Sequence, residues 1–396
     1  MRRDSPIAYV LLYVALYGAF GVASPFWPKL FQSKGLTLQE VGWILAAALV
    51  VRLVTGPLVG RLADAMASLR LVLAVSIVLA AAAAAALLAI NTFWFVLLVS
   101  LVQAAALSPT TSIADALTVN TARPHLAGRP LEYGWIRGAA SAAFLSGTLI
   151  IGQLITRTDL NSIIWTNVAL LVVAVAAIAF LPRPMPEHQS STSVVPVAGE
   201  ARRLLKLPAF RTVIVVSALV YGSHALYDAF AVIRWSGAGL DASTISILWA
   251  EAVAAEVAVF FLIGPWLIDR IGARGAAVVA ALAGVVRWSS MSSTNSVLLL
   301  SLLQPLHGLT FALLHLACMR VLGIVVPVGA AATAQTLYAF GAGLVTAVLT
   351  SLSGTLYVRY EGCAFLSMAT LCLLALPFAW YGLPNHANQR RLSINS

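Results

Sequence analysis

The sequence predicts an all-α membrane protein in which twelve transmembrane helices form two pseudo-symmetric halves of six helices each. The first observation is composition: 61% of the 396 residues are apolar, 10% are charged, and the mean hydropathy is +0.93. Soluble domains carry roughly 25% charged residues, so a water-soluble globule is excluded. The second is a series of twelve apolar runs, each near the ~20 residues that a spanning helix needs. The third is a long polar stretch that separates six runs from six.

Each predicted span is an apolar run of helical length bounded by polar, Gly-rich or Pro-rich residues. A membrane β-barrel is excluded, because its strands would read as short segments of alternating polarity. The first run follows Arg2 and Arg3 but continues through Pro25 and Pro28, so we expect an uncleaved span rather than a signal peptide. The predicted spans are 7–31, 40–60, 71–90, 93–115, 134–156, 162–182, 212–233, 243–264, 275–292, 296–320, 327–356 and 362–383.

The charged residues are spread between the apolar runs. The net charge is +10, yet the basic residues form no single patch with interleaved aromatic residues, which argues against a nucleic-acid partner. Most of the 24 Lys and Arg fall in loops on the same side as both termini, and basic loops stay in the cytoplasm during insertion. We expect a monomeric, multi-pass protein of the inner (plasma) membrane, surrounded by lipid, with both termini cytoplasmic.

The polar stretch between the sixth and seventh spans divides the chain into two halves. We expect an N-terminal six-helix half at 1–182, a cytoplasmic central loop at 183–211, a C-terminal six-helix half at 212–383 and a cytoplasmic tail at 384–396. The three cysteines show no pairing or metal-ligand spacing, so neither a cofactor nor a metal site is expected.

The end of the second span of each half carries a similar motif. The first copy runs from Gly56-Pro57 to Asp64, and the second begins at Gly264-Pro265. A Gly permits a tight turn, and an Asp beside an Arg can hold helix ends together at one membrane face. We predict a gating loop formed by Asp64, Asp269, Arg270, Gly272 and Arg274; the alternative is an ordinary basic loop. The second copy resembles the signature loop of the major facilitator superfamily.

Ionisable side chains at bilayer depth cost several kcal/mol each unless they are paired or hydrated, so each is a candidate for function. Acids and bases occur in both halves, which suits a hydrated cavity in which carboxylates exchange protons and arginines meet an anionic or hydroxylated ligand. The set is Arg52, Asp115, Arg137, His224, Asp228, Glu251, Glu256, Arg287, His307 and His315, with Gln304 and Gln335 as uncharged companions.

Helical spacing suggests which of these side chains meet. At 100° per residue, Gln304, His307, Phe311 and His315 share one face of the tenth span; helix-packing hydrogen bonds are the alternative role for the histidines. His224 and Asp228 lie four residues apart on one face. Three further expectations concern the carboxylates: Glu251 and Glu256 point in different directions, Glu256 pairs with Arg287, and Asp115 meets Arg137 across a short loop.

Longer motifs occur along nearly the whole chain and are most specific in the tenth span. They are Pro25-Phe26-Trp27-Pro28, Tyr133-Gly134-Trp135-Ile136-Arg137, Ser223-His224-Ala225-Leu226-Tyr227 with Phe230, Leu248-Trp249-Ala250 with Ala255-Glu256, Arg287-Trp288, and Leu306-His307-Gly308-Leu309-Thr310-Phe311 with His315-Leu316-Ala317. In these motifs the chain resembles the 3-phenylpropionate permease family, a relative of lactose permease within the major facilitator superfamily.

The resemblance implies proton-coupled symport of a small organic solute by alternating access. It assigns an acid and an arginine of coupling to Glu256 and Arg287, the coupling histidine to His307 or His315, and a substrate-side pair to Asp115 and Arg137. Two positions depart from the family pattern: Asp228 stands where an aromatic residue is usual and Glu251 where Gly is usual.

We therefore expect a proton symporter that takes up an aromatic carboxylate such as 3-phenylpropionate, or a sugar. The alternatives are proton-driven efflux of drugs or metabolites, and a sensor without transport. An enzyme is not expected, because His307 and His315 lack the four-residue spacing of a helical metal pair. The predicted substrate-binding residues are Arg137, Trp135, Tyr227, Phe311, Gln304 and Asp115. The predicted proton-coupling residues are Glu256, His307, His315, Arg287, His224 and Asp228.

Overall fold

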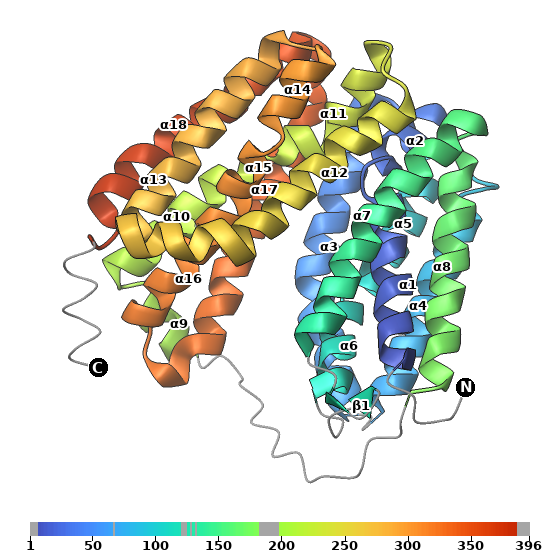
Figure 1. Ribbon diagram of the computed structural model, residues 1–396, viewed down its shortest axis with the longest axis horizontal. Coiled ribbons are helices and arrows are strands. Elements are labelled where there is room, and N and C mark those ends of the chain that lie inside the picture. The colour runs from blue at the N-terminus through green and yellow to red at the C-terminus, as the bar shows by residue number, and fades with distance from the viewer. Residues whose placement is uncertain are drawn as a thin grey trace. The chain divides into compact units, whose positions relative to one another are not determined.

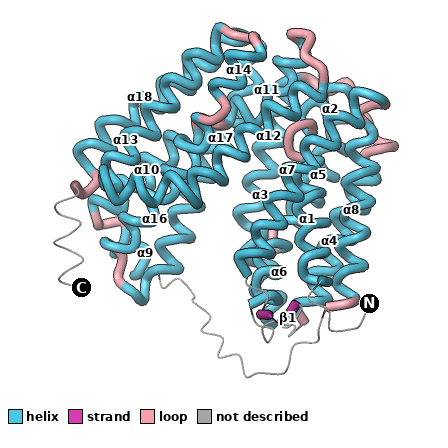
Figure 2. Tube along the Cα trace, viewed as in Figure 1, coloured by secondary structure: helices cyan, strands magenta, loops and turns pink. Residues whose placement is uncertain are grey.

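The computed structural model describes residues 7–65, 68–119, 125–126, 129–130, 133–181 and 198–385. Helices make up nearly all of this part of the chain (Figure 2), which agrees with the predicted all-α class. Its only strands are β1 (His125–Leu126) and β2 (Arg129–Pro130), which form a two-residue antiparallel ladder. The described residues divide into two compact units, one from Met1–Ser191 with Gly239–Ile247 and one from Thr192–Ala238 with Leu248–Ser396.

The first unit is built around its N-terminal helix. Its helices are α1 (Ile7–Ala23), α2 (Trp27–Ser33), α3 (Leu38–Ala65), α4 (Leu69–Ala86), α5 (Phe93–Leu107), α6 (Thr110–Val119), α7 (Tyr133–Arg157) and α8 (Asn161–Ala179). Helix α1 packs along α7 and α8 (Figure 1). A Cβ at Gly147 would lie 2.6 Å from the Gly18 carbonyl oxygen, so glycine is what lets these two backbones approach. Asn167 adds an interhelical bond by donating to the Ala19 carbonyl at 2.9 Å.

The second unit contains longer helices that are interrupted by other helical turns. Its α-helices are α9 (Ala198–Leu204), α10 (Pro208–Gly222), α11 (Ala225–Gly237), α12 (Ala242–Ala258) from Leu248 onward, α13 (Gly264–Ser293), α14 (Val297–Leu303), α15 (Leu306–Gly308), α16 (Leu314–Val325), α17 (Ala331–Tyr360) and α18 (Phe365–Pro377). Three π-helical turns, η1 (Val259–Ile263), η2 (Leu309–Leu313) and η5 (Phe378–Gly382), and two 3₁₀ turns, η3 (Val328–Ala330) and η4 (Glu361–Ala364), connect or end them.

Nine helical segments of the described chain are long and apolar enough to cross a membrane, and the bent pair α1–α2 adds a tenth. Two of the nine, Ala242–Ser293 and Ala331–Gly382, are 52 residues long. At 1.5 Å per residue each would extend about 78 Å, more than twice the ~30 Å hydrocarbon core. Each contains a break in a left-handed backbone conformation, at Gly272 (φ 71°) and Glu361 (φ 47°). Each therefore accounts for two spans, which is consistent with twelve.

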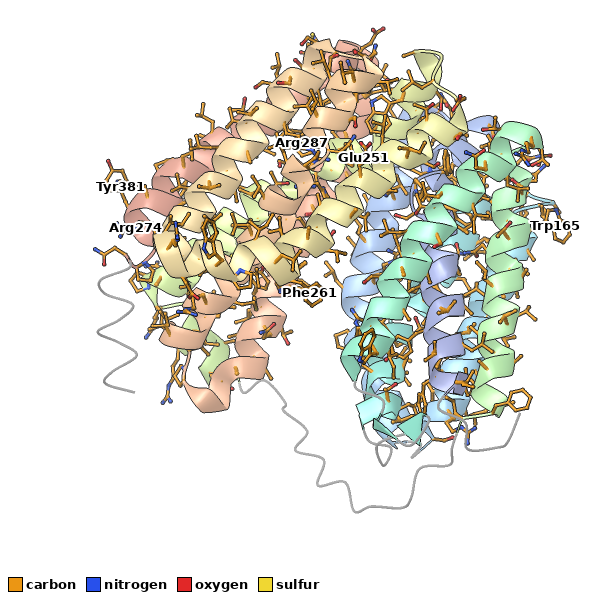
Figure 3. All side chains as sticks on the ribbon, in the orientation of Figure 1. Trp165, Glu251, Phe261, Arg274, Arg287 and Tyr381 are labelled. Atoms are coloured by element: carbon orange, nitrogen blue, oxygen red, sulfur yellow. The ribbon has the colours of Figure 1, made fainter. Side chains whose placement is uncertain are left out.

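The exposed surface is apolar, as expected for a protein in lipid. Trp165 and Tyr381 project away from their helices and are 63% and 83% exposed (Figure 3). Large aromatic side chains with this exposure would be unfavourable in water but suit a bilayer, whose interfaces are enriched in Trp and Tyr.

Four predicted spans are not the continuous helices that we expected. The span at 212–233 is interrupted between α10 and α11, and the span at 296–320 between α14 and α15. The span at 7–31 bends by 49° between α1 and α2, where Pro25 and Pro28 lie. The span at 93–115 is interrupted at Ser108-Pro109, where α5 ends and α6 begins. In the spans at 7–31 and 93–115 proline removes a backbone donor, so the helical hydrogen-bond ladder cannot continue unchanged.

Candidate functional site

The candidate site of the second unit lies where two π-helical turns meet. Turn η1 follows Glu256 in the eighth span, and η2 follows His307 in the tenth. The two turns are in contact. A Cβ at Gly308 would lie 2.6 Å from the Ala255 carbonyl oxygen, so glycine permits an approach that any side chain would prevent. The close approach places His307 directly beside Glu256, and π turns of this kind are frequent at functional sites.

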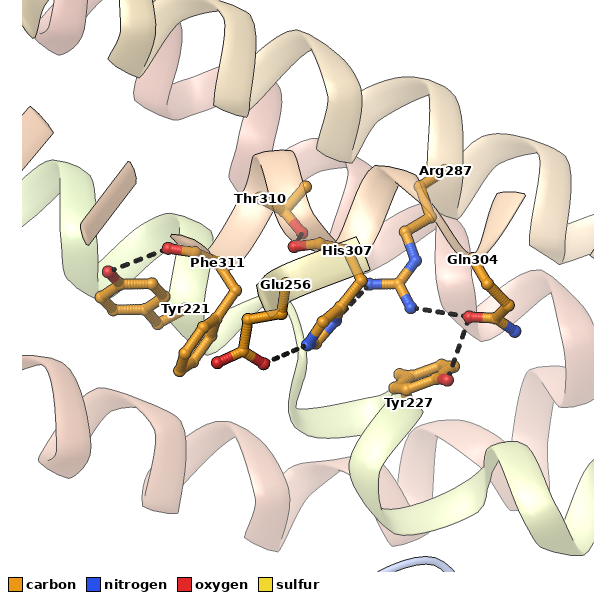
Figure 4. Close-up of polar contacts among 8 residues, drawn as sticks. All are labelled: Tyr221, Tyr227, Glu256, Arg287, Gln304, His307, Thr310 and Phe311. Carbon is orange, nitrogen blue, oxygen red and sulfur yellow. Dashed lines mark hydrogen bonds and ion pairs between the residues drawn. The ribbon is translucent and has the colours of Figure 1, made fainter. Parts of the chain in front are cut away.

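A continuous chain of polar contacts starts at this point (Figure 4). The Glu256 Oε2 and His307 Nε2 atoms are 3.5 Å apart, and His307 Nδ1 lies 3.0 Å from Arg287 Nη1. Arg287 Nη2 donates to Gln304 Oε1 at 3.1 Å, and the Tyr227 hydroxyl donates to the same oxygen at 3.1 Å. The chain links a carboxylate to a phenol through an imidazole, a guanidinium and an amide.

The contact with Arg287 fixes the protonation of His307. A guanidinium has donors but no acceptor, so His307 Nδ1 must accept the bond and carries no proton. The neutral ring then has its hydrogen on Nε2, facing Glu256. A second proton on the ring would break the bond to Arg287. In this conformation, therefore, Glu256 is the member of this chain of polar contacts that can take up a proton without breaking a contact.

Arg287 is a fully buried member of the chain of polar contacts. Its side chain is fully buried, and its guanidinium carbon lies 4.5 Å from the ring centres of both Tyr227 and Trp288. Such cation–π contacts stabilise a desolvated guanidinium. The predicted direct pair of Glu256 with Arg287 is wrong in detail, because the His307 ring lies between them and contacts both.

Aromatic rings surround the chain of polar groups. Phe311 stacks on His307 with ring centres 5.6 Å apart, and Trp249 stacks on Tyr227 at 5.0 Å. The His224 ring packs edge-on against His307 at 5.1 Å, and its buried Nε2 has no hydrogen-bond partner in the described structure. Sequence reasoning missed the role of Trp249, although its place seven residues before Glu256, two helical turns away, could have suggested it.

Other predicted residues of the second unit lie at the edge of this chain or away from it. Asp228 is exposed and interacts electrostatically with Arg287 and Glu256. No hydrogen bond or ion pair joins it to His224 among the described residues. His315 lies against Phe260 and Tyr338, with ring centres 5.8 and 6.2 Å away. It also interacts electrostatically with Glu256. Of the predicted face of the tenth span, the structure thus gathers Gln304, His307 and Phe311 and leaves His315 outside.

The two acids of the eighth span point in different directions, as expected. Glu251 Oε1 accepts a hydrogen bond of 2.8 Å from the Ser301 hydroxyl, whereas Glu256 faces His307. Figure 3 shows Glu251 and Arg287 on separate helices of the second unit.

The first unit contains a second polar cluster. Asp115 accepts a hydrogen bond of 2.5 Å from the Tyr13 hydroxyl and lies 3.8 Å from Arg137, so the expected meeting of these two charges occurs. Arg137 also donates to the Tyr17 hydroxyl and lies over the Tyr17 ring at 5.1 Å. Sequence reasoning missed both tyrosines, although their four-residue spacing on one helix face was a usable signal. Trp135, predicted to bind substrate, is 73% exposed.

Comparison with known proteins defines the family. A model of the MFS_1-like family matches residues 7–369. The chain belongs to this family. It is 31% identical over 320 residues to the probable 3-phenylpropionic acid transporter of Escherichia coli (strain K12), which covers 78% of this chain and 79% of that protein.

Solved structures confirm the fold of this MFS_1-like protein. A point mutant of the nucleoside transporter NupG matches with a TM-score of 0.83 at 17% identity, covering 95% of this chain and 99% of that one. A D-xylose–proton symporter matches with a TM-score of 0.67 at 13% identity, covering 96% and 98%. The protein is thus a multi-pass membrane transporter of the major facilitator superfamily and not an enzyme, as its sequence predicted.

The predicted gating loop of this MFS_1-like transporter is described only in its second copy. Asp269 forms an exposed ion pair of 3.6 Å with Arg320, and Arg270 lies over the Trp266 ring at 4.5 Å. Arg274 Nε donates to the Leu383 carbonyl at 2.8 Å. Gly272 adopts the positive φ that ends the span. These contacts tie together the ends of several helices. The side chain of Asp64 lies outside the described residues.

Proposed function

We propose that the protein is a proton symporter of the inner membrane that takes up a small organic solute, with an aromatic carboxylate such as 3-phenylpropionate as the first candidate and a sugar as the second. The E. coli relative named for 3-phenylpropionic acid supports the aromatic carboxylate. In this proposal the transporter acts as a monomer with both termini in the cytoplasm.

The polar chain from Glu256 to Tyr227 carries the proposal. Glu256 faces a neutral imidazole rather than a fixed positive charge, so its negative charge at bilayer depth is poorly compensated. A proton on Glu256 removes that charge and turns the carboxylate into a hydrogen-bond donor. The change alters its contact with His307. His307 accepts a hydrogen bond from Arg287, and Arg287 also donates to Gln304. Protonation and the shape of the binding site are thereby linked.

The rings beside the chain suit an aromatic solute. In the proposal, the partly exposed Phe311 packs on the ring of the solute. Tyr227 and Gln304 are buried in this conformation and reach the solute when the conformation changes, and the Gln304 amide nitrogen, which has no partner in the described structure, then donates to it. Arg137, Asp115 and Trp135 are the substrate-binding residues proposed within the first unit. His224, Asp228 and His315 take part in proton exchange with Glu256.

The test is the pH of a lightly buffered suspension of energy-depleted cells that express the protein. Phenylpropionate, cinnamate, a β-galactoside and a nucleoside are added in turn. External alkalinisation with one solute, absent in Glu256→Gln and present in the matched Glu251→Gln variant, would support proton symport and identify the solute class.

Two outcomes would contradict the proposal. Absence of alkalinisation with every solute, while the protein is present in the membrane, rejects symport of these solutes. Lower accumulation of the solute in expressing cells than in cells without the protein would point instead to efflux.

A further inference from the structure

Besides Arg137 and Arg287, a third arginine lies at bilayer depth, and it belongs to the first unit. Arg52 lies near the middle of the candidate span Leu38–Gly60 of α3. Its side chain has no hydrogen bond, ion pair or ring contact with any described residue, and no described charged group acts on it electrostatically. A guanidinium in this position is costly unless water or a ligand satisfies its five N–H donors.

Arg52 lies on a different side of α3 from the exposed apolar side chains of that helix. The exposed apolar side chains of α3, Trp43, Val50, Val54 and Leu58, fall within about 80° of one another at 100° per residue. Arg52 points about 160° away from the centre of that stripe.

The side toward which Arg52 projects is the one that packs on α5 and its break. A Cβ at Gly56, one turn further along α3, would lie 2.9 Å from the Ser108 hydroxyl oxygen, and that hydroxyl donates to the Arg52 carbonyl at 2.9 Å. Arg52 is nevertheless exposed. It is therefore accessible on the side of α3 away from the exposed apolar side chains, next to the interruption of α5 at Ser108-Pro109.

The other two arginines at bilayer depth already have partners. The charge of Arg137 is offset by Asp115 at 3.8 Å, and Arg287 is fully buried against Tyr227 and Trp288. Neither supplies an uncompensated positive charge to an anionic solute. Arg52 does, and a guanidinium matches a carboxylate with two parallel hydrogen bonds.

We propose that Arg52 binds the carboxylate of the transported solute and so makes the transporter selective for organic carboxylates over neutral solutes such as sugars. This inference deepens the proposed function and rests on it. It assigns the negative end of the solute to the first unit and leaves Glu256 of the second unit to the proton.

The experiment compares the full-length wild type with Arg52→Gln, Arg52→Lys and the control Arg157→Gln, which removes an exposed arginine at the end of α7. Initial uptake of 3-phenylpropionate gives KM and the maximal rate, and inhibition by the neutral analogue 3-phenylpropionamide gives the affinity for the uncharged ring. The amount of each variant in the membrane is measured in parallel.

We expect Arg52→Gln to raise the KM for 3-phenylpropionate at least tenfold and to leave inhibition by the amide unchanged. Arg52→Lys should recover part of the lost affinity for 3-phenylpropionate, because lysine keeps the positive charge but lacks the two parallel N–H donors of the guanidinium. Arg157→Gln should resemble the wild type. An unchanged KM in Arg52→Gln, or an equal loss of affinity for acid and amide, overturns the inference while the proposed function stands. Absence of carboxylate uptake by the wild type rejects both.

Discussion

At the scale of single residues, Arg287 connects the polar groups of the candidate site to its aromatic rings. Its guanidinium bonds to Gln304 and His307, and its carbon lies 4.5 Å from the centres of two aromatic rings, Tyr227 and Trp288. A lysine ammonium would keep the charge but lose the planar fork and the stacking. We expect Arg287→Lys to lower the initial rate of solute uptake more than tenfold at an unchanged amount of protein in the membrane, since charge-assisted hydrogen bonds contribute about 1.5–3 kcal/mol each.

Arg359→Lys is the matched control for this substitution, because Arg359 is exposed at the end of α17. Wild-type uptake by Arg287→Lys would mean that only the charge matters, and that the polar chain through His307 is not required for transport.

A smaller effect is expected at Tyr227. Tyr227→Phe keeps the stack on Trp249 and the ring beneath Arg287 but removes the hydrogen bond of 3.1 Å to Gln304. One such bond contributes about 1 kcal/mol, so the KM should rise roughly fivefold with little change in maximal rate. Tyr357→Phe, in which the ring stacks on Phe230 away from the polar chain, should leave the KM unchanged. Equal KM values for the two variants would remove Tyr227 from substrate binding.

The sequence predicts which residues at bilayer depth bear on function better than it predicts how they are connected. Glu256, His307 and Arg287 stand out because charge is rare in these spans. Their order along the polar chain depends on a ring lying between a carboxylate and a guanidinium, and residue spacing within one helix carries no information about contacts between helices. The four-residue spacing of Tyr13 and Tyr17 places both rings on one helix face, but a tyrosine in an apolar run does not reveal whether its hydroxyl meets a charge.

At the scale of elements, the spans follow from apolar length, but their interruptions do not. The segments Val259–Ile263 and Leu309–Leu313 read as ordinary apolar helix and form π turns instead. A π turn inserts one residue into a helical turn, so every later side chain is rotated relative to an ideal helix. A constant 100° per residue places His315 on the same face as His307. The rotation at the π turn is one reason why the structure places His315 elsewhere, beside Tyr338.

The approach of these two turns leads to a prediction at Gly308. An alanine Cβ there would lie 2.6 Å from the Ala255 carbonyl oxygen and 2.8 Å from a Val259 methyl carbon, so the two helices must separate. Separation moves His307 away from Glu256, and we expect Gly308→Ala to reduce uptake about tenfold and to weaken its dependence on external pH. Uptake at several pH values measures both effects.

Gly323→Ala provides the control in the same span, because a Cβ at Gly323 meets no atom within 4 Å. If Gly308→Ala transports as well as Gly323→Ala at each pH, the close approach of the eighth and tenth spans has no part in coupling.

At the scale of the whole molecule, a proton symporter can move its solute in two ways, by net accumulation and by exchange. Net accumulation requires the empty transporter to return without its proton, whereas exchange of labelled for unlabelled solute needs only the loaded forms. In Glu256→Gln the side chain at this position is permanently neutral, like the protonated acid, and still fits beside His307. Binding and exchange should therefore survive, while the return step that depends on a released proton should fail.

We accordingly expect Glu256→Gln to exchange external labelled solute for internal unlabelled solute within about twofold of the wild-type rate, and to show no accumulation driven by a pH gradient in vesicles. The exchange rate should also lose its dependence on pH, because the group that titrates has been removed. Loss of both exchange and accumulation would place Glu256 in substrate binding. Accumulation in the variant equal to the wild type would show that another of the acids at bilayer depth, with the exposed Asp228 first among them, carries the proton.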